Sequence, residues 1–169
     1  YVQGRHIQAI ERYEDLLLAE ARRLIDAFRF GDAYPYLERV AQIAPDWPGL
    51  AEAIVEYHRE EGIRSDILGR PDRAFWSLIE ARRACDALAE PGGLPKSIQG
   101  DIDRVADKWA AERLRAKDFA EVRRIVARLE SVHPDSAVAA KYRAEIARGV
   151  QTLLKESQTL ASQGSPLDS

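Results

Sequence analysis

The sequence predicts an all-α protein. Apolar residues recur at helical spacing along most of the 169 residues, and the helix-favouring residues Ala, Leu, Arg and Glu are abundant. Alternating Val, Ile and Thr runs and Asn-Gly or Asp-Gly hairpin turns, which are the usual signs of strands, are missing from the sequence. Glycines, prolines and short polar runs divide the helical pattern into about seven segments.

The first three helices are predicted at about 3–29, 32–43 and 48–68. The first is long for a globular helix, so its N-terminal half is expected to protrude or to pack on a partner. The stretch PDWP (45–48) forms a turn, and its second proline suits the first turn of the third helix. Gly69 ends that helix.

The remaining helices are predicted at about 71–89, 97–116, 119–132 and 136–160. The stretch EPGGLPKS (90–97) is the longest connection between helices. Asp135 or Ser136 caps the last helix, because a short side-chain oxygen accepts from free helical N–H groups. The polar tail 162–169 is expected to be disordered.

Composition narrows the class of protein. The chain is 46% hydrophobic and 31% charged, which suits a single soluble domain over about 1–161. The net charge of -3 indicates no general affinity for nucleic acid, and no apolar run reaches the ~18 residues of a membrane span. Methionine is missing even at position 1, so we expect a processed form or a part of a longer protein, from the cytoplasm or from outside it.

A spacing of 4, 3 and 5 residues recurs three times. It occurs at Val122, Val126, Leu129 and Pro134, at Ala33, Leu37, Val40 and Pro45, and, with Asp86 in place of proline, at Ala74, Leu78 and Ala81. Three residues before each start stand Phe30, Pro71 and Phe119, and twelve residues before each start stand the small residues Ala21, Gly62 and Ala110. Two helices approach closely where a small residue lies at their crossing, and the 4-3 spacing keeps apolar side chains towards the neighbouring helix.

This pattern resembles the tetratricopeptide repeat, a helix–turn–helix unit of about 34 residues. DFAEVRRIVARLESVHP (118–134) is the best match, and LGRPDRAFWSLIEARRA (68–84) and FGDAYPYLERVAQIAP (30–45) are fair ones. The resemblance implies a tetratricopeptide-like α-solenoid of antiparallel hairpins, with units at about 14–47, 48–89 and 97–134 and a capping helix at 136–160. The repeats here are longer than the family's period, so a generic α-solenoid of helical hairpins is the nearby alternative.

Two further stretches are similar to helical regions that precede some bacterial extracellular solute-binding domains. They are ERYEDLLLAEARRLI (11–25) and YLERVAQIAPDWPGLAEAI (36–54). This resemblance implies a helical accessory or self-assembly domain of a larger extracytoplasmic transport protein.

The residues that usually carry chemistry form no recognisable constellation. His6, His58 and His133 form no i, i+4 pair, and Cys85 is the single cysteine, so we expect no metal site. Phosphate-binding glycine motifs are missing, and no cofactor is expected. His133 lies before a proline at a helix end, where a cation suits the helix dipole.

Acidic residues cluster at Glu14-Asp15, Glu60-Glu61 and Asp101/Asp103. Two carboxylates can serve as acid and base, but the first two clusters lie on helices rich in arginine and are therefore expected on the solvated surface. The sequence thus predicts no enzyme. A small-molecule-binding or enzymatic helical domain is the alternative from another class.

In the tetratricopeptide family the first helix of each unit lines a groove that holds a peptide or a partner segment. Carried over to this chain, the groove positions are Asp15, Arg22, Asp26, Arg59, Asp66, Arg104, Lys108 and Arg115. Trp76 and Trp109 are expected in the core, whereas Trp47, in the PDWP turn, is expected to be a partly exposed contact residue. We therefore expect a non-enzymatic module that binds a protein or peptide partner, with self-association through the first helix as a rival.

Overall fold

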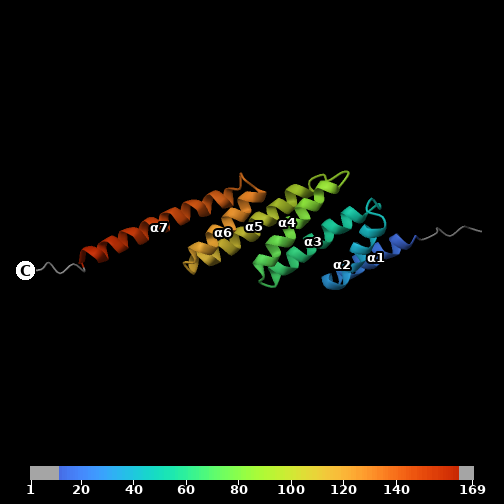
Figure 1. The fold of residues 1–169 in the computed structure, drawn as a ribbon, viewed down its shortest axis with the longest axis horizontal. Coiled ribbons are helices and arrows are strands. Elements are labelled where there is room, and N and C mark those ends of the chain that lie inside the picture. The colour runs from blue at the N-terminus through green and yellow to red at the C-terminus, as the bar shows by residue number, and fades with distance from the viewer. Residues whose placement is uncertain (1–11, 164–169) are drawn as a thin grey trace, which may run out of the picture. The chain divides into compact units, whose positions relative to one another are not determined.

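The computed structural model describes residues 12–163, and within this range it contains seven α-helices and one short 3-10 helix (Figure 1). The elements are α1 (Tyr13–Asp26), α2 (Phe30–Ile43), α3 (Leu50–Ile67), α4 (Pro71–Ala84), η1 (Cys85–Ala87), α5 (Leu94–Arg115), α6 (Phe119–Val132) and α7 (Ala137–Gln163). The all-α class and the number of helices are therefore confirmed. The chain divides into two compact units, residues 1–99 and 100–169, and each is described by itself.

Most helix bounds lie close to their predicted positions, and the differences have local causes. α6 matches its prediction, and α4 begins at the expected proline, Pro71. α3 begins after Pro48 and not at it, because Gly49 takes a φ of 85° that ends the preceding turn. α5 begins at Leu94, so the predicted long connection at 90–97 is shorter than expected.

Two predictions concern the ends of the chain. α7 extends to Gln163, so the prediction of disorder from 162 onwards is wrong for the first two residues of the tail. Residues 164–169 and the predicted N-terminal half of the first helix, 3–11, lie outside the described residues.

The three turns that follow α1, α3 and α5 share one backbone geometry. Each contains one residue in the left-handed region, and the N–H of the next residue donates to a carbonyl five residues earlier. The left-handed residues are Phe28, Gly69 and Lys117, with φ of 56°, 69° and 58°. The N···O distances are 2.8 Å for Arg29 to Leu24, 2.9 Å for Arg70 to Ser65 and 2.9 Å for Asp118 to Arg113. The same turn therefore recurs where the sequence pattern places the three units.

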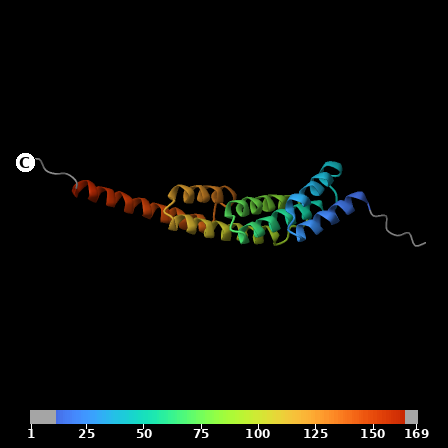
Figure 2. The same cartoon turned by 90° about the horizontal axis from the view of Figure 1, so that it is seen from below.

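Close helix packing in the first unit depends on the small residues of the pattern. A Cβ added to Gly62 of α3 would lie 2.7 Å from Leu78 Cγ and 3.2 Å from the Ala74 carbonyl oxygen of α4. Ala21 and Ala33 are fully buried. α3 and α4 accordingly lie side by side in both views (Figures 1 and 2).

In the second unit, α6 packs on α7 in a similar way. A Cβ on Gly149 would lie 2.6 Å from the Phe119 ring. The Ser136 hydroxyl accepts from the N–H of Ala139 at 3.3 Å, which confirms Ser136 as the cap of α7. The Tyr142 hydroxyl donates to the Asp107 carbonyl oxygen at 2.9 Å and ties α7 to α5.

The tryptophans predicted for the core have different outcomes. Trp109 is 4% exposed, as predicted. Trp76 is 45% exposed, so its core prediction is wrong. It lies two residues from both Ala74 and Leu78, which face α3, and two residues correspond to about 200° around a helix.

Candidate functional site

The first unit carries five of the predicted groove residues, of which Asp15 is described below with Trp47. Arg22 of α1 donates to the Gly49 carbonyl oxygen at 3.2 Å, and its Nε lies 3.7 Å from a Glu56 carboxylate oxygen. Arg22 therefore links α1 to α3. Asp26 is exposed, Arg59 is half-buried and Asp66 is buried. Arg59 lines a small hollow of ≈ 220 Å³ together with three glutamates of α3.

The second unit carries the other three predicted groove residues. Arg104, Lys108 and Arg115 all lie on α5 and are exposed. Their neighbour Asp107 accepts a hydrogen bond from Lys141 of α7 at 2.6 Å, and this bond lowers the pKa of its carboxyl group. Arg104 also pairs with the Asp101 carboxylate at 3.5 Å, so this exposed face of α5 carries both cations and carboxylates.

Trp47, the predicted contact residue, is half-buried and packs against the core of the first unit. Its indole N–H donates to the Asp15 carboxylate at 3.1 Å, and the Arg12 guanidinium lies 5.4 Å from the ring centroid. Asp15, also predicted for the groove, is therefore a partner of the tryptophan. Both side chains fix the α2–α3 turn against α1.

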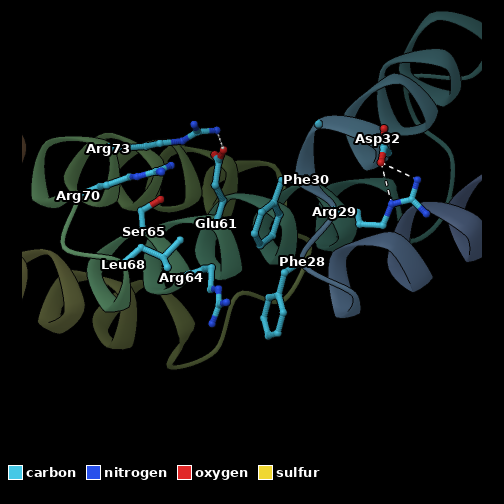
Figure 3. Close-up of a pocket in the computed structure, with 11 residues that line it drawn as sticks. Phe28, Arg29, Phe30, Asp32, Glu61, Arg64, Ser65, Leu68, Arg70 and Arg73 are labelled. Carbon is cyan, nitrogen blue, oxygen red and sulfur yellow. Dashed lines mark hydrogen bonds and ion pairs between the residues drawn. The ribbon is translucent and has the colours of Figure 1, made fainter.

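The structure also shows a pocket that the sequence did not predict. It lies in the first unit, where the α1–α2 turn meets the α3–α4 turn, and its volume is ≈ 400 Å³ (Figure 3). We call it the arginine pocket. Its lining residues are Phe28, Arg29, Phe30, Gly31, Asp32, Glu61, Arg64, Ser65, Leu68, Arg70 and Arg73.

The lining of the arginine pocket has four arginines and two carboxylates, in a chain whose net charge is -3. Two of the arginines are paired inside the pocket: Arg29 lies 2.7 Å from Asp32, and Arg73 lies 2.5 Å from Glu61. Arg70 has no ion pair or side-chain hydrogen bond with any of the residues 12–163. The pocket therefore keeps an excess of positive charge.

Glu61 is buried, at 9% exposed, so the prediction that the Glu60-Glu61 pair lies on the solvated surface is wrong for this residue. It lies on the side of α3 that faces α4, where its two oxygens accept from Arg73 at 2.5 Å and from Ser77 at 2.9 Å. Burial, followed by the Glu61 charge, raises the pKa of the adjacent Tyr57 to about 12. Glu61 is therefore a structural carboxylate that orients Arg73 at the pocket wall.

A polar group at the pocket wall has no partner in the structure. Ser65 is 5% exposed, and its hydroxyl makes no hydrogen bond to another side chain or carbonyl in the described part of the chain. In Figure 3 this hydroxyl points towards the ends of the Arg70 and Arg73 side chains. A hydroxyl that is open to the pocket and lies next to unpaired positive charge is suited to a ligand that carries an oxyanion.

Phe28 forms the opposite wall of the pocket and is 52% exposed. Its φ of 56° is unfavourable for a bulky residue and is set by the turn that follows α1, in which Phe28 takes the left-handed position. The Arg64 guanidinium lies 4.8 Å from the centroid of its ring, a cation–π contact (Figure 3). Phe28 and Arg64 together form an amphipathic platform beside the cationic wall.

One feature of the sequence could have indicated the pocket. The residue before α6 is Asp118, whose carboxylate caps its own helix by accepting from the Glu121 N–H at 3.1 Å. The equivalent residues before α2 and α4 are Arg29 and Arg70, and neither helix has a side-chain cap. An arginine thus stands before both α2 and α4 where α6 has a capping acid, and the two arginines line the same pocket.

No group of three or more potential metal ligands is found among residues 12–163, and none of the helices in this range combines the length and apolar composition of a membrane span. The chain matches no known family model, no curated protein and no solved structure.

Proposed function

We propose that the chain is a non-enzymatic protein-interaction module built as a tetratricopeptide-like α-solenoid. The recurring turn after α1, α3 and α5 and the close packing at Gly62 support the repeat. In this proposal the scaffold is rigid, and the partner binds to its surface.

The observation that carries the proposal is the arginine pocket with its exposed aromatic wall. Arginine and aromatic side chains dominate the binding energy of protein interfaces, because each offers a large contact area together with polar groups. Arg70 and Phe28 provide this combination on turns of the first unit.

The exposed cations of α5 provide a second contact surface within the proposal. Arg115 lies in the last turn of α5 and Arg104 and Lys108 lie earlier on the helix. All three correspond to groove positions of the tetratricopeptide family. A partner segment with acidic residues would suit this face.

The proposal is tested by selecting random dodecapeptides displayed on phage against the whole chain. We expect clones that bind saturably and that weaken with Arg115→Glu on α5, while Arg123→Glu, an exposed residue on α6, leaves binding unchanged. Failure to enrich any saturable clone would contradict the proposal.

A further inference from the structure

We infer that the arginine pocket binds an acidic peptide, with the oxyanion of one side chain held by Arg70 and Ser65 and an adjacent apolar side chain placed on Phe28. The inference rests on the proposed function and gives it a ligand class. It follows from four properties of the pocket: charge, an unpartnered hydroxyl, apolar surface and size.

The positive charge of the pocket indicates that its ligand is an anion. Asp32 and Glu61 already neutralise Arg29 and Arg73, whereas the Arg70 guanidinium has no charged partner within residues 12–163. A guanidinium presents a planar set of N–H donors that matches the oxygens of a carboxylate or a phosphate. An oxyanion at this position would therefore form charge-assisted hydrogen bonds without displacing an existing ion pair.

The hydroxyl of Ser65 is the second observation. Ser65 lines the pocket, and its hydroxyl, which points towards the ends of the Arg70 and Arg73 side chains, is open to the solvent of the pocket and has no protein partner within residues 12–163. A ligand oxygen near Arg70 would satisfy it. α4 starts immediately after Arg70 with Pro71, and no side chain caps its N-terminus.

The apolar wall of the pocket indicates which kind of side chain lies next to the acidic side chain of the peptide. The ring of Phe28 is half exposed, and Arg64 covers it with a delocalised cation. An apolar or aromatic side chain next to the acidic one would cover this ring and remove apolar surface from water.

Size favours a peptide over a nucleic acid. A hollow of ≈ 400 Å³ holds one or two side chains. A nucleic acid requires instead a basic surface that follows several successive phosphates, and the chain carries a net charge of -3.

The test uses a fluorescein-labelled peptide, Gly-Ser-Glu-Phe-Gly-Ser, and three related probes. In two of them glutamine or phosphoserine replaces the glutamate, and the third is an oligouridylate of similar length. Fluorescence anisotropy at physiological salt is expected to show binding of the glutamate or the phosphoserine peptide and at least tenfold weaker binding of the glutamine peptide. The preferred acid distinguishes carboxylate from phosphate as the oxyanion.

Variants of the chain locate the binding. Arg70→Gln is expected to weaken binding of the acidic peptide about tenfold or more, and Ser65→Ala is expected to weaken it about two- to tenfold. The matched control is Arg39→Gln, which removes the same charge from an exposed position of α2 in the same unit and is expected to change binding less than twofold. Circular dichroism checks that each variant is folded.

Each other outcome contradicts a specific statement. Equal binding of the acidic and glutamine peptides, or an Arg70→Gln variant equal to Arg39→Gln, overturns the inference but leaves a peptide-binding function. Preference for the oligouridylate overturns the peptide as ligand. If no peptide binds, but 3-phenylpropionate shifts pocket resonances in NMR spectra and 3-phenylpropanamide does not, the proposed interaction function fails and the pocket is a small-acid site. If neither binds, both the function and the inference are wrong.

Discussion

Gly62 offers the sharpest test of how the first unit is held together. Alanine favours a helix over glycine by about 1 kcal/mol, so Gly62→Ala would stabilise α3 if the helix were isolated. In the folded chain the new Cβ would lie 2.7 Å from Leu78 Cγ and 3.2 Å from the Ala74 carbonyl oxygen. Ordinary carbon–carbon contacts begin near 3.5 Å. Because Leu78 is fully buried and Ala74 contributes backbone, neither can move away without disturbing the packing of α3 on α4.

Overpacking costs about 1–3 kcal/mol, and contacts of 2.7 Å and 3.2 Å with neighbours that cannot move place this site at the upper end, about 2–3 kcal/mol, which exceeds the gain in helix propensity. We therefore expect Gly62→Ala to lower the free energy of unfolding by about 1–2 kcal/mol. Gly100→Ala on α5 is the matched control, since no atom lies within 4 Å of its added Cβ, and it is expected to raise the free energy of unfolding by about 0.5–1 kcal/mol. Urea unfolding followed by circular dichroism measures both variants. Equal or greater stability of Gly62→Ala relative to wild type would refute the close-packing argument.

Three further predictions concern single contacts. Asp118→Ala removes the cap on the Glu121 N–H and should cost about 1 kcal/mol of stability, seen as a lower Tm, whereas Asp118→Asn should retain most of it; equal loss in both would contradict the cap. Glu61→Ala leaves Arg73 without its buried partner and should cost about 1–3 kcal/mol in urea unfolding, against about 0.5 kcal/mol or less for Glu60→Ala, and similar costs would argue against a structural Glu61. Burial lowers the pKa of His58, so the unfolded chain binds its proton more readily and stability should fall as the pH drops below the ordinary value of 6.5. Between pH 7.5 and 5.5, about one unit on either side of that value, the Tm of wild type should therefore fall more than that of His58→Gln, and parallel profiles would contradict this role.

The sequence was sufficient to predict the helices because their boundaries depend on local chemistry. α6 is delimited by Asp118 and by His133-Pro134, and its predicted range agrees with the structure. Its spacing of apolar residues also identified the buried Val122 and Leu129. The same reasoning failed at Trp76, because the sequence pattern did not show which face of α4 packs against α3.

The arginine pocket could not be predicted in the same way. Its walls come from two turns that are about 40 positions apart in the sequence, and their proximity depends on how α1, α2 and α3 pack, a tertiary arrangement beyond local propensity. The burial of Glu61 depends on Arg73 and Ser77 of another helix. The strain at Phe28 is equally hidden, because a phenylalanine in the left-handed region carries no sequence signal of its own. The predicted groove positions and the binding function remain predictions.

The turns that follow α1, α3 and α5 have the same hydrogen bonds but different residues at the left-handed position, and this difference has a kinetic consequence. Gly69 adopts that conformation freely, whereas Phe28 and Lys117 each cost about 1 kcal/mol there. Transient opening should therefore be easiest at the turns of Phe28 and Lys117. In hydrogen–deuterium exchange the amide of Arg29, bonded to Leu24, should lose protection sooner than the amide of Arg70, bonded to Ser65. The pocket wall at Phe28 would then open transiently more often than the wall at Arg70.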